Sequence, residues 1–583
     1  MALADTLHAK PSASPSIRPT IASHLTFTAF SALALLLMYS LLRGALLIYN
    51  RELMGDTPAS TFVEAFYNGM RFDLRVVVYA CIPVLLALFS VRAMAARHAL
   101  RWWLTGFASL TLFLALTELD FYREFHQRLN SLVFQYFQED PQTVMSMLWN
   151  GFPVGRYLLA WALATWLLAK LFKGLDLFTR PAQPSLLSSA APHSLPWQWR
   201  WLALLLCLVI SVVAARGHLR QGPPLRWGDA YTTDSMFANQ LGLNGTLTLY
   251  TAAANTFGTH RDNAWKATLN DEDALKAVRE MLLTPHDQLV DADSAAIRRN
   301  FTPPAEGTLP IKNVVVILME SFAGHFVGAL GSPLNITPHF DKLAKEGLLF
   351  DRFFSNGTHT HQGMFATMAC FPNLPGFEYL MQTPEGSHKL SGLPALLSSR
   401  DYDDVYVYNG DFAWDNQSGF FGNQGMTTFI GRNDFVNPVF SDPTWGVSDQ
   451  DMFDRGNEEL AKHDGKKPIY ALLQTLSNHT PYALPKDLPV EKVTGQGRLD
   501  EHLTAMRYSD WALGQFFEKA RKEPYFKETL FVIVGDHGFG NERQITEMDL
   551  GRFNVPMLMI APGIQEKFGT RDHTVGTQID IVP

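Results

Sequence analysis

Five apolar runs, all within the first 216 residues, constrain this chain more than any other feature of its sequence. Each is long enough to cross a bilayer, which takes about 20 mostly apolar residues. The runs cover residues 24–49, 75–95, 102–121, 157–174 and 199–216. A helix is the form in which a single span satisfies its own backbone hydrogen bonds. We therefore predict a five-helix transmembrane domain over residues 1–216.

Ionisable residues are few within these runs. Arg43 lies near one end of the first run, where its side chain can reach the interface, and Glu118 and Asp120 lie at the end of the third. A transporter would need such groups near the middle of the membrane, so the pattern favours an anchor. The first run is longer than the apolar part of a signal peptide and lacks a small-residue cleavage site. We interpret it as a retained span.

Lys and Arg set the orientation of the predicted spans, because they concentrate in cytoplasmic loops. They gather in the second loop, around the fourth loop and before the first span: Arg92, Arg97, Arg101; Lys170, Lys173, Arg180, Arg200; Lys10, Arg18. The first and third loops mix basic residues with comparable numbers of acidic ones. The N-terminus is therefore predicted to be cytoplasmic, and five crossings put everything after residue 216 outside.

The rest of the chain has the composition of a globular domain. A length of 583 residues exceeds what one core supports, so at least two domains are expected. The net charge of −8, with no basic tail, argues against a nucleic-acid partner. Of the 3 cysteines, Cys370 alone lies beyond the apolar runs, so no disulfide framework is expected there.

The connecting segments have patterns of their own. The third loop, residues 121–156, has aromatic residues and Leu at helical spacing, which predicts a helix along the membrane surface. The fourth loop, residues 181–196, has the Pro/Ser/Ala composition of a flexible cytoplasmic connector. We predict that residues 217–310 form an extracytoplasmic linker with short helices, among them Asp271–Leu283.

From residue 311 the pattern changes to short β-rich runs separated by segments of helix length. The predicted strands are Asn313–Met319, Val405–Tyr408, Ile469–Leu473, Leu530–Val534 and Val555–Ile560. Helices are predicted over Thr337–Gly347 and Asp500–Arg521. Strands that alternate with helices indicate a mostly parallel sheet covered on both faces. Because ligands of such sheets gather beyond the carboxyl ends of the strands, we expect the functional residues there.

Two predicted strands end in residues that can bind a metal. Glu320 follows the first strand, and Asp536 and His537 follow the fourth, between two glycines. Two carboxylates and an imidazole suit Mn²⁺ or Zn²⁺ and, less well, Mg²⁺. One carboxylate at a strand end would be ordinary, so the metal interpretation depends on the two strands being neighbours.

A polar loop, residues 355–363, lies between these strands and precedes a helical start at Met364. A hydroxyl at a helix N-terminus is most often an N-cap. A hydroxyl that binds a metal has a lowered pKa and becomes a nucleophile, and the helix N-terminus attracts a phosphate. Spacing alone does not choose between Thr358 and Thr360. His479 lies in another loop. It could act as a general acid, contact a substrate head group, or have no functional role.

Four motifs together resemble the lipoteichoic acid synthases and their phosphoglycerol transferase relatives, within the alkaline phosphatase/sulfatase superfamily. The motifs are Met319-Glu320-Ser321-Phe322, Gly357-Thr358-His359-Thr360, Leu476-Ser477-Asn478-His479 and Gly535-Asp536-His537-Gly538. The phrase Thr337-Pro338-His339-Phe340-Asp341-Lys342-Leu343-Ala344 is similar to a wider superfamily signature. The resemblance extends to the five N-terminal spans. It implies an α/β alkaline phosphatase/sulfatase-like catalytic domain over residues 311–583.

The resemblance also implies roles for individual residues. One divalent cation, manganese first and Mg²⁺ or Zn²⁺ as alternatives, would be held by Glu320, Thr360, Asp536 and His537. Thr360 would be the nucleophile. His479 would contact the substrate head group, and Asp411, Trp414 and Asn416 match positions that shape the substrate pocket.

Two departures from the family pattern stand out. Asn416 occupies a position where the synthases carry an arginine, and an amide cannot replace the charge or the two-pronged phosphate contact of that residue. Arg432 or Arg543 could supply the positive charge of that arginine instead, or the substrate could differ from that of the synthases. The chain ends at Pro583, where relatives continue into another helix, so we expect the C-terminus to be truncated.

The activity implied by the resemblance is the transfer of a glycerophosphate group from phosphatidylglycerol to a glycan or polymer acceptor, through a phospho-threonine intermediate. The site would face the periplasm or the outer surface of the cell membrane. The nearest alternative is a phosphoethanolamine transferase, a family whose soluble domains usually carry several disulfides. A phosphatase, phosphodiesterase or sulfatase-type hydrolase and a catalytically silent membrane sensor are the others. Cys370-Phe371-Pro372-Asn373-Leu374 lacks the arginine of the sulfatase cysteine motif.

Overall fold

The fold was analysed in a computed structural model, and the chain divides into two compact units. The structure describes residues 20–137, 139–181, 196–217, 224–225, 227–233, 235–257, 269–293, 299–302, 309–373, 380–382, 386, 388–540 and 548–582. The first unit takes the described residues up to Val133 and those of Pro153–Ala254. The second takes Phe134–Phe152 and the described residues from Asn255 onward. The predicted fourth-loop connector lies, apart from its two end residues, outside the described residues.

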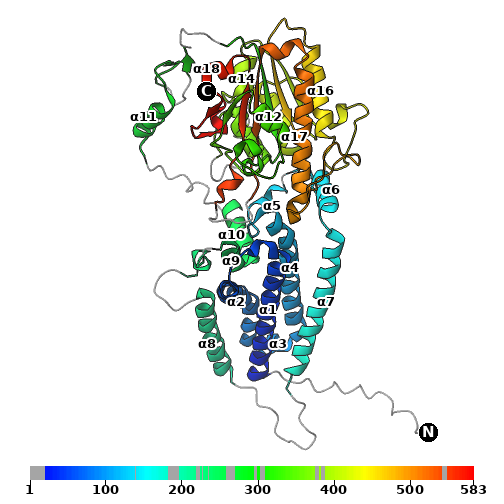
Figure 1. Cartoon of the computed structure of the whole chain (residues 1–583). Helices are drawn as coiled ribbons and strands as arrows, with labels where there is room; N and C mark the ends of the chain where they lie inside the picture. Colours follow the sequence, from blue (N-terminus) through cyan, green and yellow to red (C-terminus); the bar gives the residue numbers. More distant parts are fainter. Residues whose placement is uncertain are drawn as a thin grey trace, which may run out of the picture. The chain divides into compact units, whose positions relative to one another are not determined.

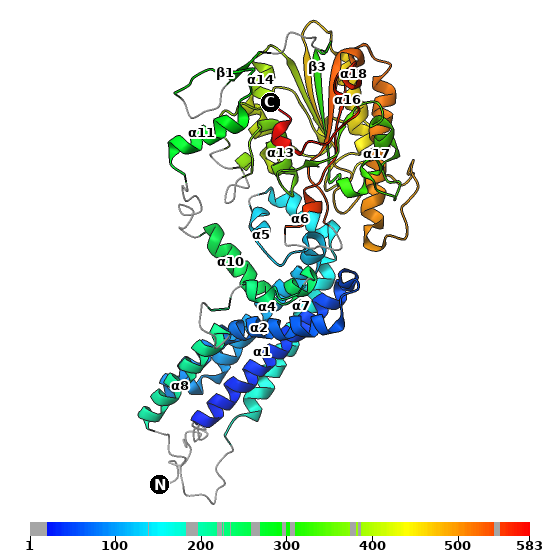
Figure 2. The ribbon, with the colours of Figure 1, turned by 60° about the vertical axis from the view of Figure 1, so that its left-hand side comes forward.

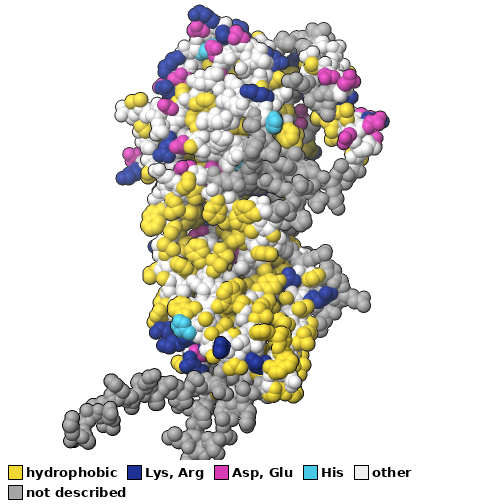
Figure 3. Space-filling model, turned by 180° about the vertical axis from the view of Figure 1, so that it is seen from behind, with side chains coloured by type: hydrophobic (Ala, Val, Ile, Leu, Met, Phe, Trp, Pro, Cys, Tyr) yellow, Lys and Arg dark blue, Asp and Glu magenta, His cyan; other side chains and the backbone are white. Residues whose placement is uncertain are grey.

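The first unit contains five helices that are long and apolar enough to cross a membrane (Figure 1). They are α1 (Ile21–Tyr49), α2 (Ala59–Leu86), α4 (Arg97–Phe125), α7 (Val154–Phe178) and α8 (Trp197–Arg216). On the face seen in Figure 3, hydrophobic side chains cover most of this unit, and Lys and Arg gather at its lower end, where Figure 1 draws α3 (Val91–Ala95). The five predicted helices are confirmed, although α2 begins at Ala59 rather than at residue 75.

The position of Arg43 near a span end predicted a side chain that reaches the membrane interface. In the structure the side chain is buried instead, at 5% exposure, and its Nη2 donates to both carboxylate oxygens of Asp73 in α2, at 2.8 and 2.7 Å. Gly69 makes room for the guanidinium, since a Cβ there would come within 2.1 Å of Arg43 Cζ. Asn244 Nδ2 also donates to Asp73, at 2.7 Å. A buried partner thus replaces the water that an interfacial arginine would have.

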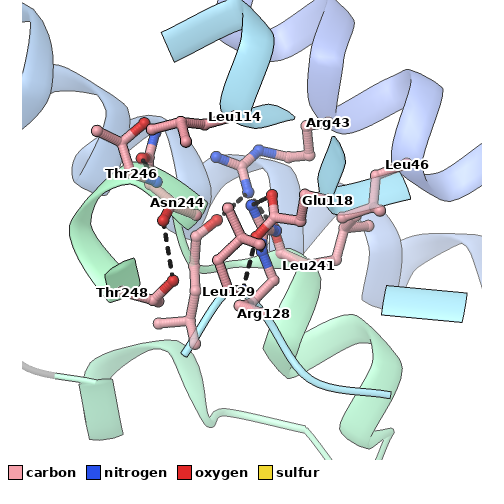
Figure 4. Close-up of polar contacts among 12 residues, drawn as sticks. Arg43, Leu46, Leu114, Glu118, Arg128, Leu129, Leu241, Asn244, Thr246 and Thr248 are labelled. Atoms are coloured by element: carbon pink, nitrogen blue, oxygen red, sulfur yellow. Dashed lines mark hydrogen bonds and ion pairs between the residues drawn. The ribbon is translucent and has the colours of Figure 1, made fainter. Parts of the chain in front are cut away.

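A second buried ion pair lies in the same unit (Figure 4). Arg128 donates to both carboxylate oxygens of Glu118, at 2.8 Å each, and the Leu129 N–H donates to Glu118 at 3.2 Å. Asp120, two residues further along α4 and half-buried, accepts hydroxyl hydrogen bonds from Tyr49 at 2.5 Å and Tyr157 at 2.6 Å. Both acids at the end of the third predicted span therefore bond to neighbouring segments.

We predict that Arg43→Met destabilises the full chain by about 3–5 kcal/mol, because it leaves Asp73 buried without its counter-charge. The double variant Arg43→Met/Asp73→Leu should recover most of that loss, since no charge is then left unpaired. Thermal unfolding in detergent measures both effects. A single variant as stable as the wild type would contradict the assigned pairing.

Six shorter helices and a small hairpin connect the longer elements. The helices are α3, α5 (Leu132–Gln135), α6 (Pro141–Gly151), α9 (Met236–Leu241), α10 (Gly245–Phe257) and α11 (Asp271–Leu282). The hairpin pairs β1 (Asp287–Leu289) with β2 (Arg299–Phe301). α11 matches the helix predicted in the linker. In the third loop, α6 buries Val144 and Met147, and Met147 packs into the core of the second unit. This packing was not predicted from the sequence.

The second unit is built on an eight-stranded sheet in the order β11-β4-β10-β9-β3-β8-β6-β7. Its strands are β3 (Asn313–Met319), β4 (Leu348–Phe350), β6 (Asp403–Tyr408), β7 (Phe429–Ile430), β8 (Ile469–Gln474), β9 (Thr529–Gly535), β10 (Met557–Ile560) and β11 (Arg571–Asp572). All pairs are parallel except those made by β10, which runs antiparallel to β4 and β9. Two short strands, β5 (Phe353–Phe354) and β12 (Gly576–Thr577), pair separately. The mostly parallel sheet and all five predicted strands are confirmed.

Helices cover both faces of this sheet (Figure 2). Residues of β3 alternate between two cores: Val315 and Ile317 face one, Val316 and Leu318 the other. The first core includes side chains of α12 (Pro338–Leu343), α16 (Asp449–Lys462) and α17 (Asp500–Ala520). The second includes side chains of α13 (Thr360–Ala369), α14 (Leu393–Ser398) and α15 (Gln417–Gln424), while α18 (Ile564–Phe568) follows β10. Burial on both faces explains why these strands are continuously apolar.

Candidate metal centre and its aromatic neighbours

Two carboxylates meet at the carboxyl edge of the sheet because β3 and β9 are parallel neighbours. Their register pairs Met319 with Gly535, so the next residue on each strand is a carboxylate, Glu320 and Asp536. The Asp536 N–H donates to the Met319 carbonyl at 3.1 Å, which carries the pairing one residue further. Both side chains are buried, at 2% and 0% exposure. The sequence-based condition that the two strands be neighbours is therefore met.

The carboxylates and His537 form a three-residue cluster whose ligand atoms all lie within 4.8 Å of one another. His537 Nε2 is 3.6 Å from Glu320 Oε1 and 3.7 Å from Asp536 Oδ2. Asp536 Oδ1 accepts backbone hydrogen bonds from Ser321 at 2.8 Å and from His537 at 2.6 Å. Within the described part of the chain, the buried Oδ2 of Asp536 has no hydrogen-bond partner. A divalent cation fits this donor set and would satisfy that oxygen.

The electrostatics of the cluster also favour a cation. Burial, together with the negative charge of Glu320, holds the pKa of Asp536 well above its usual range. Burial also opposes ionisation of Glu320, but the nearby His479 and His537 and the hydroxyls of Ser321 and Thr360 lower its pKa. Two buried carboxylates this close repel each other when both are ionised. A bound cation would remove that repulsion.

The Thr360 hydroxyl joins this cluster, and the Thr358 hydroxyl does not. Thr360 is the first residue of α13, and its Oγ1 donates to Glu320 Oε2 at 3.0 Å. Thr358 Oγ1 instead lies 3.0 Å from His359 Nδ1. The contacts thus separate the two threonines that spacing left equivalent. They also put the Thr360 oxygen at a helix N-terminus, where free N–H groups favour an anion.

Gly363 allows α13 to approach the metal-binding edge. A Cβ on Gly363 would come within 1.9 Å of the Asp536 carbonyl oxygen, so no other residue fits without a backbone shift. The same carbonyl accepts a hydrogen bond from Gln578 Nε2 at 2.7 Å, and Gln578 Oε1 accepts the Asn356 N–H at 2.9 Å. Helix and strand end are thereby held in contact.

His479 belongs to an aromatic cluster (Trp414, Trp445 and His479) next to the candidate metal ligands. Its ring packs on Trp445 with 4.2 Å between centroids, and Trp445 packs edge-on against Trp414 at 5.0 Å. Asn478, the preceding residue, donates to the Glu320 carbonyl at 3.1 Å. The cluster contains two of the residues singled out from the sequence.

The other two predicted substrate residues shape the turn around Trp414. Asp411 Oδ1 accepts the Ala413 N–H at 2.9 Å. Asn416 is exposed, and its amide donates to the Met381 carbonyl at 2.8 Å. Arg432 is one candidate to replace the family's arginine. Its guanidinium donates to the Thr444 and Pro443 carbonyls, at 3.0 and 3.2 Å, and is therefore bonded to the backbone. The other candidate, Arg543, lies outside the described residues.

Three positioning residues were not found from the sequence. Asp449, 0% exposed, accepts the N–H groups of Leu476 and Ser477 at 2.8 and 2.9 Å and so fixes the loop that carries His479. Thr475 Oγ1 accepts the Glu320 N–H at 2.8 Å. Trp445 links the two predicted aromatic residues. Asp449 begins α16, and its role follows from its burial, since a buried acid requires partners.

Comparisons with known proteins bear mainly on the second unit. Residues 312–583 match the model of the sulfatase family. Lipoteichoic acid synthase 1 of Bacillus subtilis is 28% identical over 331 residues, 51% of this chain and 49% of that protein. The lipoteichoic acid synthase of Staphylococcus saprophyticus is 28% identical over 303 residues, 48% of this chain and 45% of that protein. The chain thus spans about half the length of the curated relatives that it matches.

One solved structure resembles the chain over almost its whole length. The integral membrane protein lipooligosaccharide phosphoethanolamine transferase A of Neisseria meningitidis has a TM-score of 0.50 and 15% identity, covering 96% of this chain and 94% of that one. At this identity the likeness concerns the fold alone. It agrees with an N-terminal set of apolar helices followed by a domain of sulfatase-like fold.

We predict that Mn²⁺ raises the melting temperature of the wild-type chain, and that Asp536→Asn abolishes this rise. A ligand at 100 times its Kd stabilises a protein by about 2.7 kcal/mol, and the variant lacks one anionic ligand. Thermal unfolding with Mn²⁺, Mg²⁺ and Zn²⁺, combined with metal analysis of the purified protein, provides the measurement. Glu566→Gln, an exposed acid on α18, is the matched control. An unchanged metal response in Asp536→Asn would exclude this site.

Proposed function

We propose that this chain is a membrane-bound, metal-dependent phosphoglycerol transferase. It would move a glycerophosphate group from phosphatidylglycerol to a glycan or polymer acceptor. The observation that carries the proposal is the 3.0 Å contact of Thr360 Oγ1 with Glu320, beside Asp536 and His537. Similarity to lipoteichoic acid synthases supports it.

In this proposal the residues divide the chemistry between them. Glu320, Thr360, Asp536 and His537 would hold the cation, which would withdraw charge from the phosphoryl oxygens. Thr360 Oγ forms a bond to phosphorus as the bond to the diacylglycerol oxygen breaks. Its hydroxyl proton has Glu320 as the nearest acceptor. Diacylglycerol takes up a proton and leaves, and the phosphoglycerol group stays on Thr360.

The second step reverses the first with a new alcohol. The acceptor hydroxyl attacks the same phosphorus, loses its proton and restores the Thr360 hydroxyl. His479 and Trp414 would contact the glycerol head group, and Asp411 and Asn416 would shape the turn that presents Trp414. With Asn416 in place of an arginine, phosphate charge would fall more heavily on the cation and on the N-terminus of α13.

In the proposed organisation, the reaction takes place at the external face of the cell membrane. Residues 1–216 would anchor the protein in the membrane, with the N-terminus in the cytoplasm. Residues 217–310 would form the linker, and residues 311–583 would form the catalytic domain, in the periplasm or on the outer face of the membrane. Basic side chains at one end of the membrane-helix unit support this orientation (Figure 3). The bilayer then supplies the lipid donor directly to the site.

Phosphoethanolamine transfer is the second candidate. Asn416 leaves the donor head group open, because it stands where the synthases carry an arginine that would bind the donor phosphate. The two candidates share the nucleophile and differ in the donor head group, so a direct comparison of lipids separates them.

We predict that the wild-type chain with Mn²⁺ releases diacylglycerol from labelled phosphatidylglycerol and acquires a phosphoglycerol adduct on Thr360. In Thr360→Ala both signals should fall by at least about 10³-fold, as expected for loss of a nucleophile. Mass spectrometry of the lipids and of the peptide with residues 355–363 gives both readouts. Thr358→Ala, which removes the neighbouring hydroxyl, should keep the adduct.

Other outcomes point elsewhere. Diacylglycerol from phosphatidylethanolamine alone would select the second candidate. Free glycerol phosphate, formed equally with and without a glycan acceptor, would indicate a hydrolase. Release of diacylglycerol from neither lipid would overturn both transferase proposals.

A further inference from the structure

The third loop of the membrane-helix region contributes a segment to the catalytic unit. Residues 134–152, called the inter-span segment here, lie in sequence between α4 and α7 but belong to the second compact unit. Met147, 6% exposed, lies in the same core cluster as Val316 of β3 and Met364 of α13. Tyr136 packs against this cluster. The segment is therefore part of the fold that carries the metal ligands.

Glu139 of this segment bonds to the turn that follows Trp414. Its Oε2 accepts the Asp415 N–H at 3.1 Å, and its Oε1 accepts the side-chain amide of Gln382. Gln382 Nε2 also donates to Asp415 Oδ1 at 3.4 Å. Burial, with the negative charge of Asp415, raises the pKa of Glu139 to about 7, and burial raises that of Asp415 to about 7. Asp415 is buried and Glu139 is half-buried at this contact.

The turn held by Glu139 has an unusual backbone. Asp415 and Asn416 are consecutive left-handed residues, with φ of 56° and 52°, and neither is a glycine. This conformation is uncommon outside glycine, and although Asp and Asn adopt it more readily than most residues, contacts around the turn help to hold two of them in succession. Glu139 supplies such a contact at the Asp415 N–H, and Met381 supplies another through the Asn416 amide.

The same turn also contacts the residue that follows the proposed nucleophile, Thr360. Asp415 Oδ1 lies 3.5 Å from Nδ1 of His361, the residue that follows Thr360 in α13. Asp415 is 3% exposed and His361 is 7% exposed. A chain of contacts thus runs from Glu139 through Asp415 to the first turn of α13.

A second contact of the inter-span segment supports the opposite side of the aromatic cluster. Ser146 Oγ lies 3.0 Å from Thr444 Oγ1, and Asn150 Nδ2 donates to the same oxygen at 2.9 Å. Thr444 precedes Trp445, whose ring lies between Trp414 and His479. Two separate contacts therefore end one residue away from two members of the aromatic cluster.

We propose that the inter-span segment positions the aromatic cluster for the donor head group, with Glu139 as the positioning residue for the Trp414–Asn416 turn. This inference rests on the proposed function, in which Trp414 and His479 contact that head group. The contacts of Glu139 described above are with Gln382 and Asp415, and they include neither Thr360 nor the proposed metal ligands. Its effect is therefore expected in donor binding rather than in the chemical step.

The test compares variants of the full-length chain in detergent. Glu139→Ala is expected to raise the KM for phosphatidylglycerol about tenfold, the size of effect expected from one buried hydrogen bond to a charged group, with kcat within about threefold of the wild type. Glu139→Gln keeps an oxygen acceptor for the Asp415 N–H and should restore KM to within about threefold. Ser146→Ala/Asn150→Ala, which breaks the second contact, should raise KM in the same direction. Gln142→Ala, an exposed change on α6, should leave both constants unchanged.

Hydrogen exchange gives a readout that does not depend on activity. The peptide with residues 411–417 should exchange about tenfold faster in Glu139→Ala than in the wild type, while peptides of β3 and β9 stay protected. Unchanged KM and exchange in Glu139→Ala would overturn the inference. So would a fall in kcat alone, faster exchange throughout the unit, or a Glu139→Gln defect as large as that of Glu139→Ala. If the wild type releases diacylglycerol from no lipid, the proposed function fails, and the exchange result still decides whether Glu139 holds the turn.

Discussion

The parallel pairing of β3 with β9 is the constraint on which the site depends. It brings Glu320 and Asp536 side by side in a buried setting where two negative charges are costly. The surrounding contacts relieve part of that cost, through backbone N–H groups on Asp536 and hydroxyls on Glu320. The remaining cost is what a cation would remove. A fold that keeps such a pair gains cation affinity in exchange for stability in the metal-free state.

The helix that carries Thr360 is positioned by the same edge of the sheet. Gly363 lets α13 lie against the Asp536 carbonyl, and this close approach brings the first residue of the helix to Glu320. A hydroxyl, two carboxylates and an imidazole thus come from three separate stretches of the chain. Because each is fixed by backbone packing, the arrangement exists before any substrate is bound, which is what electrostatic stabilisation of a phosphoryl group requires.

The sequence predicted the elements of this fold better than their arrangement. Strand and helix positions were predictable because the strands are buried on both faces and are continuously apolar. The antiparallel direction of β10 was not, since a short apolar run gives no sign of its direction. The neighbouring strands and the Thr360 contact depend on tertiary pairing, which spacing cannot supply. The burial of Arg43 was not predicted for a similar reason, since its partner, Asp73, lies on another helix.

Under the proposed function, the inter-span segment would link membrane anchoring to catalysis along one chain. A domain independent of the membrane helices would be expected to complete its own site, yet here Thr444 and the Asp415 N–H bond to residues encoded between two predicted spans. The left-handed turn at Asp415 and Asn416 would lose one of its enforcing contacts if that segment were removed. Anchoring then does more than keep the enzyme near its lipid. In the proposed mechanism, the same polypeptide that crosses the bilayer also helps to form the surface that distinguishes one lipid head group from another.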